Sequence, residues 1–350
     1  MRDVAQILLV FDLEGKLLGE IALPTLGSIG GISGHKKQRQ MFFKFTSFTY
    51  PGTIFTYDLE TQEQKVFKET VIDGFQASAF VTKQVFFPSK DGTKIPMFII
   101  HPAGLELNGN SPTILYGYGG FQISINPSFS TTRCNFLAGY NAVYAIANIR
   151  GGAEYGVDWH KGGILENKQN SYDDFIGAAE YLIQERFTNS NKLAILGGSN
   201  GGLLVAACMN QRPDLFRTVV SQVGVLDLLR YHKFTIGYMW ASDYGLSDNP
   251  DQFPFISKIS PLHNLRSDNQ YPALLLTTAD HDDRVVPGHS FKFAAQIQHL
   301  NPNNQRPLLI RIESKAGHGA GKPTDKVMEE IAEIYAFIGK TTESVWTTPK

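Results

Sequence analysis

Cysteine is scarce in this sequence, and several other signals of secreted proteins are missing. Its 350 residues include two cysteines, Cys134 and Cys208, too few for the disulfide framework of a small secreted domain, although a single bridge between them stays open. No Asn-x-Ser/Thr glycosylation site occurs, because Asn126-Pro127-Ser128 is blocked by its proline. The first residues, Met1-Arg2-Asp3-Val4, lack the segments of a signal peptide. We therefore expect a cytoplasmic protein.

The sequence also lacks a surplus of charge of either sign. Lys and Arg total 32 against 33 Asp and Glu, a net charge of −1, so nothing favours nucleic acid or an anionic membrane as a partner. No apolar run approaches the ~18 residues of a membrane-spanning helix. The chain is 42% hydrophobic and 19% charged, which is typical of a well-buried core. We expect a monomer with one large domain or two smaller ones.

The first 72 residues have the pattern of a small antiparallel β-sheet. Apolar-rich runs flank the turn signals Glu14-Gly15 and Pro51-Gly52. These runs are residues 6–11, 16–21, 41–45 and 53–57. They predict one four-stranded sheet that buries little surface by itself. Such a sheet is either an appendage packed on the main domain or a single blade of a β-propeller whose other blades are not in this sequence.

From about Gln76 to the end, strands alternate with helices. The predicted strands are 85–88, 97–101, 113–116, 142–147, 193–196, 218–222, 273–277 and 308–312. Ser171 and Asp174 resemble a capping box that opens a helix, residues 288–300 are helix-like, and Pro323-Thr324 opens the last helix. This alternation predicts an α/β fold with a doubly wound, mostly parallel sheet and a ligand crevice at the carboxyl ends of its strands. The predicted domains are 1–72 and 73–350.

The strongest functional signal surrounds Ser199. Residues 193–207 read as a strand, a G-x-S-x-G turn and an apolar helix. A serine hydroxyl is a weak nucleophile until a base removes its proton, so it must stand clear of the backbone, where a histidine can reach it. A sharp turn between strand and helix achieves this, and the crowding that it imposes requires glycines on either side. The alternative is a glycine-rich loop without function, since the motif alone also occurs by chance.

An acidic residue should follow the nucleophile along the chain, because α/β hydrolases have the order Ser, Asp or Glu, then His. The turn after strand 273–277 contains Asp280, Asp282 and Asp283, and their spacing cannot choose among them. A hydrated acidic turn or a metal site is the alternative, but a metal would need a third or fourth ligand that the sequence does not visibly supply.

The base should be a histidine beyond this turn. His289 and His299 fall in the helix-like segment and have the pattern of surface residues. His318 lies in the glycine-flanked loop 315–321, after the last strand, where the imidazole has freedom to reach over the sheet edge. A second oxyanion donor should come from residues 116–121, a glycine-rich loop directly after an early strand. A backbone N–H or a tyrosine hydroxyl can serve there.

Residues from about Gln76 to the end resemble the catalytic domain of the prolyl oligopeptidase family. The match is continuous and includes the motifs at 116–121, 148–156, 197–205, 280–287 and 315–321. One departure is Ala153, where the family usually has a third glycine. The first 72 residues resemble the last blade of the family's β-propeller. The resemblance implies that the chain is a C-terminal part of a longer family member.

The resemblance implies an α/β-hydrolase fold and assigns the site. It makes Ser199 the nucleophile, Asp282 the orienting acid and His318 the general base. The Tyr118 hydroxyl and the Asn200 backbone N–H would form the oxyanion hole.

The resemblance also implies a pocket for a proline ring. Trp240 would stack its indole on that ring, because stacking rewards a flat and rigid apolar group. Arg284 would bind the peptide carbonyl that precedes the proline. The other pocket residues would be Phe121, Val225, Ile236, Tyr244 and Val285.

These inferences predict a serine endopeptidase that cuts short peptides on the carboxyl side of proline through an acyl-enzyme, with no metal or cofactor. Its partners would be short proline-containing peptides. One alternative is a sister peptidase of the acylaminoacyl-peptidase or dipeptidyl-peptidase type. Another is a truncated, inactive binding or regulatory module.

Overall fold

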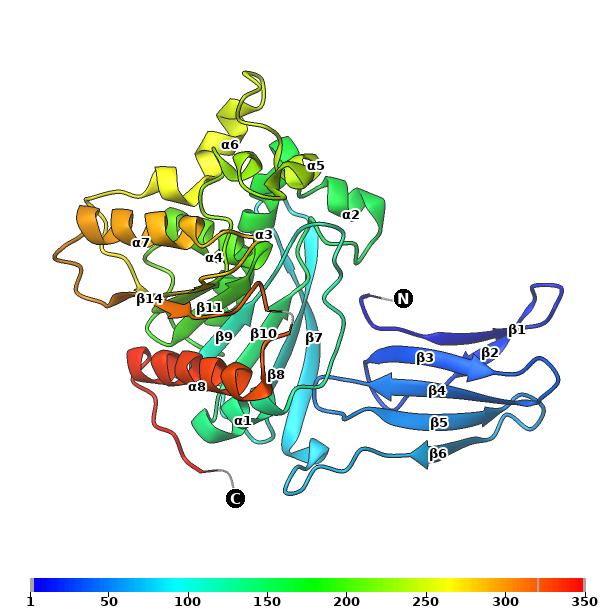
Figure 1. The fold of residues 1–350 in the computed structure, drawn as a ribbon. Coiled ribbons are helices and arrows are strands. Elements are labelled where there is room, and N and C mark those ends of the chain that lie inside the picture. The colour runs from blue at the N-terminus through cyan, green and yellow to red at the C-terminus, as the bar shows by residue number, and fades with distance from the viewer. Residues whose placement is uncertain (1–2, 320, 349–350) are drawn as a thin grey trace.

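The computed structural model describes residues 3–319 and 321–348, which form a small β part beside a larger α/β part (Figure 1). Six strands, rather than the predicted four, make the small part. β1 (Leu8–Phe11) and β2 (Leu17–Ile21) pair as an antiparallel hairpin. A separate antiparallel sheet contains β3 (Ser28–Gly34), β4 (Gln40–Thr46), β5 (Thr53–Asp58) and β6 (Gln64–Lys68). The prediction of one four-stranded sheet was therefore wrong.

The two sheets of the small part share a mainly aromatic cluster of buried side chains. This cluster consists of Ile21, Phe43, Phe45, Phe55 and Tyr57. The rings of Phe43 and Phe55 stack with centroids 5.3 Å apart. A further contact joins the small part to the larger one, because Phe48, between β4 and β5, packs on Phe98 with a centroid distance of 5.1 Å. The β part thus shares an apolar contact with the α/β part.

Eight strands form the sheet of the larger part, and each overlaps one of the eight that the sequence predicts, although β7 begins five residues earlier than predicted. They are β7 (Phe80–Pro88), β8 (Lys94–Pro102), β9 (Thr113–Tyr116), β10 (Val143–Ala147), β11 (Leu193–Gly198), β12 (Thr218–Gln222), β13 (Ala273–Ala279) and β14 (Leu308–Glu313). Their order is β14-β13-β12-β11-β9-β10-β8-β7. The strands from β14 to β10 are parallel, and β8 and β7 continue the sheet antiparallel.

Helices cover both faces of this sheet (Figure 1). One face carries α1 (Thr131–Tyr140) and α8 (Thr324–Thr341). The other carries α3 (Lys168–Gln184), α4 (Asn200–Gln211) and α7 (Gly288–Leu300). The predicted starts of α7 and α8 are confirmed.

Shorter helices lie in the connections between the strands. The α-helical ones are α2 (Val157–Lys161), α5 (Ala241–Tyr244) and α6 (Phe253–Ile259). The 3-10 turns are η1 (Ala77–Ala79), η2 (Leu165–Asn167), η3 (Tyr231–Lys233), η4 (Gly237–Trp240) and η5 (Pro261–Asn264).

α3 begins at Lys168, so the capping box predicted at Ser171 and Asp174 was wrong. Both side chains lie buried within the helix and contact the loop after β10 instead. The Ser171 hydroxyl donates to the Arg150 carbonyl at 2.7 Å. The Arg150 guanidinium lies 2.6 Å from the Asp174 carboxylate. The same residue types therefore serve to fix a loop rather than to start a helix.

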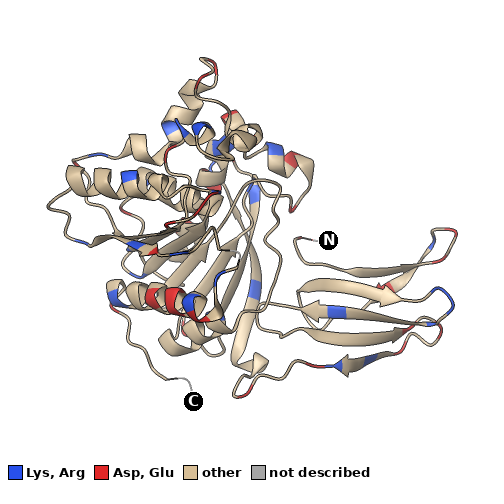
Figure 2. Cartoon of the chain, in the orientation of Figure 1, with Lys and Arg blue, Asp and Glu red and all other residues tan. Residues whose placement is uncertain are grey.

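Acidic and basic residues are interspersed over both parts of the chain (Figure 2). Cys134 and Cys208 are both free and buried, so the single bridge that the sequence left open is not formed. Within residues 3–319 and 321–348, no helix combines the length and the apolarity needed to cross a bilayer.

Candidate active site

Ser199 stands in a strained turn between β11 and α4. Its φ is 57° and its ψ is −116°, a left-handed conformation that is costly for a residue with a Cβ atom. The turn is very tight, because a Cβ added to Gly197 would lie 2.2 Å from the Gly201 carbonyl oxygen. The Ser199 N–H donates to the Gln222 carbonyl at 2.8 Å and anchors the turn. This anchored turn places the half-buried serine at the carboxyl end of β11 and at the N-terminus of α4.

Asp282 and His318 are in direct contact. His318 Nδ1 lies 2.7 Å from Asp282 Oδ2, and the Asp282 side chain is fully buried. The other carboxylate oxygen accepts the N–H groups of Arg284 at 3.0 Å and Val285 at 2.9 Å. These bonds fix the carboxylate, which in turn orients the ring. With Nδ1 engaged by Asp282, Nε2 is the nitrogen left to exchange a proton with another group.

The neighbouring candidates have other surroundings. Asp280 pairs with the adjacent His281 at 2.7 Å, and Asp283 is exposed. Of the carboxylates that spacing left open, Asp282 is the one in contact with His318. His299 is exposed as predicted, but the prediction for His289 was wrong. Its ring is buried, accepts the Asp227 N–H at 3.1 Å, and has its pKa lowered by that burial to about 4.

Tyr118 and Asn200 lie next to the serine. The Asn200 side-chain amide donates to the Tyr118 carbonyl, and the Tyr118 hydroxyl is close enough to the Ser199 side chain to interact with it. Burial, more than any neighbouring charge, raises the pKa of Tyr118 to about 12, so its hydroxyl is a neutral donor at physiological pH. Asn200 is the first residue of α4, so its backbone N–H has no partner within the helix. The helix dipole also favours negative charge at this position.

Contacts among these residues form two pairs. Ser199 is close to Tyr118, and His318 is hydrogen-bonded to Asp282. Among the described residues, no direct hydrogen bond joins the Ser199 hydroxyl to the His318 ring. His318 belongs to the loop between β14 and α8, next to Gly319 with its φ of 125°. Catalytic hydrogen bonds are often long without a substrate, so His318 stays the candidate base for Ser199.

Four aromatic rings form a continuous row beside Asn200. The Trp240 ring lies parallel to that of Tyr231, at 6.1 Å and 11°. Tyr231 meets Tyr244 edge-on at 5.3 Å, and Tyr244 meets Phe121 edge-on at 5.5 Å. The Tyr244 hydroxyl donates to the Asn200 side-chain oxygen at 2.9 Å, which connects the row to the serine turn. Sequence reasoning missed Tyr231, because only the packing reveals its ring contacts.

The other predicted pocket residues differ in exposure. Val225 and Val285 are buried, whereas Ile236 and Arg284 are exposed. Val285 and Arg284 directly follow the turn that contains Asp282. The positive charge of Arg284 also acts on Tyr118 and favours its ionised form. Arg284 therefore lies within electrostatic reach of the Tyr118 hydroxyl.

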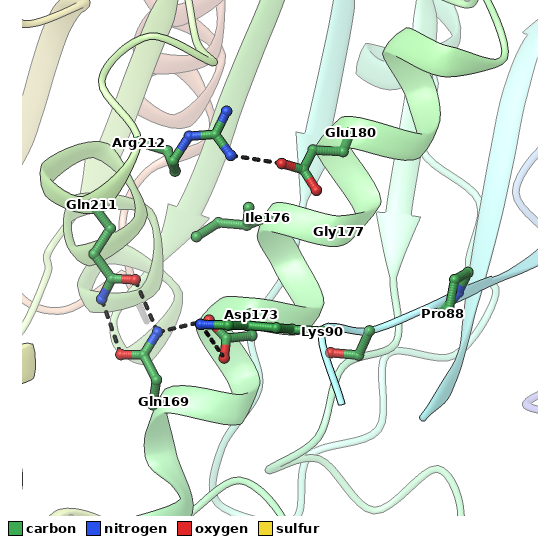
Figure 3. A pocket seen from close by; sticks show the side chains of 10 residues that line it. Pro88, Lys90, Gln169, Asp173, Ile176, Gly177, Glu180, Gln211 and Arg212 are labelled. Atoms are coloured by element: carbon green, nitrogen blue, oxygen red, sulfur yellow. Dashed lines mark hydrogen bonds and ion pairs between the residues drawn. The ribbon is translucent and has the colours of Figure 1, made fainter. Parts of the chain in front are cut away.

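A separate cavity of about 590 Å³ lies between α3, the turn from β7 to β8 and the C-terminal end of α4 (Figure 3). It contains none of the predicted site residues. Its charged groups pair with one another, since Arg212 lies 2.6 Å from Glu180 and Lys90 lies 4.0 Å from Asp173. This mutual pairing leaves little charge to recognise a ligand, so we assign no function to the cavity.

Comparison with known protein families shows which family the chain belongs to. The profile of the prolyl oligopeptidase family matches residues 127–344, and the profile of the prolyl oligopeptidase N-terminal β-propeller domain matches residues 1–70. This chain belongs to the prolyl oligopeptidase family. The predicted fold class is thereby confirmed as an α/β hydrolase domain preceded by propeller strands.

Relatives in this family cover nearly the whole chain. Prolyl endopeptidase of Dictyostelium discoideum is 50% identical over 343 residues, which are 97% of this chain and 45% of that protein. Prolyl endopeptidase of Elizabethkingia miricola is 44% identical over 338 residues, 96% of this chain and 48% of that protein. The chain spans about half the length of the curated relatives it matches.

A solved structure shows the same fold. Prolyl oligopeptidase B of Galerina marginata, bound to a 35mer hydrolysis and macrocyclization substrate, matches with a TM-score of 0.94 and 42% identity. The match covers 99% of this chain and 49% of that one.

Proposed function

We propose that this chain contains the catalytic domain of a serine endopeptidase that hydrolyses short peptides on the carboxyl side of proline. Two features at the carboxyl ends of the parallel strands support it most. One is the strained Ser199 turn beside Tyr118, and the other is His318, whose ring is held by the buried Asp282 carboxylate. Relatives named prolyl endopeptidase, at 44–50% identity over almost the whole chain, favour this activity over that of a sister peptidase.

The proposed reaction proceeds through an acyl-enzyme. Ser199 Oγ attacks the prolyl carbonyl carbon while His318 Nε2 accepts the hydroxyl proton, and Asp282 stabilises the imidazolium that forms. The Tyr118 hydroxyl and the Asn200 N–H donate to the tetrahedral oxyanion. The protonated His318 then donates to the leaving amine as the C–N bond breaks. Water attacks the acyl-enzyme with His318 as base, which releases the peptide acid and restores Ser199.

We propose that the aromatic row receives the proline ring. Trp240 supplies a flat face for stacking, and Phe121 and Tyr244 extend the wall toward the serine turn. The proposed boundary between the domains 1–72 and 73–350 falls between the end of β6 at Lys68 and the start of η1 at Ala77. A cytoplasmic location, a monomeric state and independence of metals and cofactors stay predictions.

A panel of fluorogenic peptides tests the proposed specificity. Three peptides differ only in the residue before the scissile bond, which is proline, alanine or arginine, and a fourth substrate is an N-acylated amino acid. We expect kcat/KM to be at least ~10-fold higher for proline than for alanine, since a shaped apolar pocket discriminates by about 1–3 kcal/mol. Faster release of the arginine peptide or of the acylated amino acid would instead support a sister peptidase.

Trp240→Ala is expected to weaken proline recognition selectively. Loss of the stacking face should lower kcat/KM for the proline peptide by about 10–100-fold and change the alanine peptide much less. The matched control is Trp346→Ala, because Trp346 packs on Tyr140 near the C-terminus and is not part of the aromatic row. Equal losses for both peptides would remove Trp240 from the pocket.

A further inference from the structure

Two buried charged side chains hold the backbone of the loop that carries Tyr118. Lys168 Nζ donates to the Gly119 carbonyl at 2.6 Å. Asp243 Oδ2 accepts the Phe121 N–H at 2.7 Å. Both side chains are inaccessible, with relative exposures of 1% for Lys168 and 2% for Asp243. We call Lys168 and Asp243 the loop clamp.

A third buried side chain acts on the same loop from the serine turn. The Asn200 side-chain amide donates to the Tyr118 carbonyl, and the Tyr244 hydroxyl in turn fixes the Asn200 side chain. Lys168 Nζ also lies 5.8 Å from the centroid of the Tyr244 ring. The peptide groups on both sides of Gly119 are thus held from within the protein.

The loop needs this support because its backbone is strained. Gly119 has a φ of 66°, and the next two non-glycine residues, Phe121 and Gln122, have φ values of 55° and 56°. Left-handed conformations at non-glycine residues persist only where surrounding contacts over-determine them. Hydrogen bonds to the adjacent carbonyl and N–H groups are contacts of this kind.

Lysine is a costly residue for a purely structural role at this position. Burial lowers the pKa of Lys168 to about 8, and the negative charge of Asp243 opposes that effect. An apolar side chain of similar length would fill the space without the desolvation penalty. What it could not supply is the N–H donor to Gly119.

We propose that Lys168 and Asp243 are positioning residues that set the Tyr118 hydroxyl against the oxyanion formed at Ser199. They act through the loop backbone, and neither touches the reacting atoms. The inference rests on the proposed function, since it takes Tyr118 as an oxyanion donor. Such donors act only over a narrow range of distances, so a loop shift of about 1 Å is enough to lose most of the effect.

The test is a double-mutant cycle on acylation of Ser199 in the full chain. Lys168→Met and Tyr118→Phe are made singly and together, and the burst of p-nitrophenol from p-nitrophenyl acetate gives the acylation rate. This ester needs an oxyanion hole but no proline pocket. We expect Lys168→Met to slow acylation by about 10–100-fold and Tyr118→Phe by about 100-fold. In the Tyr118→Phe background, Lys168→Met should cost less than about 3-fold, because both changes remove the same interaction.

Three further variants separate positioning from stability. Lys161→Met makes the same change at an exposed lysine and should leave the rate unchanged. Lys168→Gln keeps a neutral N–H donor and should recover part of the rate lost in Lys168→Met. Asp243→Ala removes the acceptor of the Phe121 N–H. Measured in the same cycle with Tyr118→Phe, it replaces Lys168→Met if thermal unfolding shows that variant to be unfolded.

The outcomes distinguish the clamp from the proposed function. A full multiplicative loss in the double variant, or an unchanged rate in folded Lys168→Met and Asp243→Ala, would overturn the clamp. A parent chain that is acylated but shows no preference for proline peptides would refute the substrate assignment alone. A parent chain that does not react with the ester would overturn both.

Discussion

Ser199→Ala is expected to abolish acylation of this chain. Loss of a catalytic serine lowers kcat by roughly 10⁵–10⁶-fold, because the remaining machinery can only assist attack by water. Fluorophosphonate labelling should disappear in the variant, and mapping of the adduct in the parent should locate it on Ser199. Hydrolysis of the proline peptide provides the second measurement.

The same substitution should barely affect stability. Alanine also has a Cβ, so the φ of 57° at position 199 is about as strained as with serine, and we expect the free energy of unfolding to change by less than about 0.5 kcal/mol. Ser190→Ala, in the loop before β11, is the matched control and should keep full labelling. A Ser199→Ala chain that is folded and still labelled would place the nucleophile elsewhere.

Much of the α/β part was predictable because its strands are encoded locally. β11 and β13 are short, mostly apolar runs, and all three strands from β11 to β13 are almost completely buried, as in a parallel sheet that is covered on both faces. The small β part was harder. β3 is glycine-rich and β6 is mostly exposed, so neither has the alternation that marks a strand, and only pairing with β4 and β5 stabilises them.

Site prediction shows the same division between local and long-range information. Ser199 was found because its strand, turn and helix are contiguous in sequence. Spacing could not choose Asp282 from its neighbours, since its contact with His318 spans 36 positions. Lys168 and Asp243 gave no signal at all, because lysine and aspartate are usually exposed and their burial is decided by the packing of distant segments.

Asp282→Asn separates orientation of His318 from simple anchoring of its loop. The asparagine oxygen can still accept the N–H groups of Arg284 and Val285, so the turn should keep its shape. Its amide N–H, however, would face His318 Nδ1 and favour the tautomer with the proton on Nε2, which cannot accept the serine proton. We therefore expect kcat to fall by about 10⁴-fold with little change in thermal unfolding.

The control is Asp280→Asn, two positions earlier in the same turn. Asp280 pairs with the exposed His281 and has no contact with His318, so its loss should cost less than about 3-fold in kcat. If Asp282→Asn and Asp280→Asn lowered kcat equally, the negative charge of the turn, and not the specific contact between Asp282 and His318, would be what matters for kcat. If Asp282→Asn retained parental kcat, the contact between Asp282 and His318 would be structural. The base that activates Ser199 would then be another group at the carboxyl ends of the parallel strands.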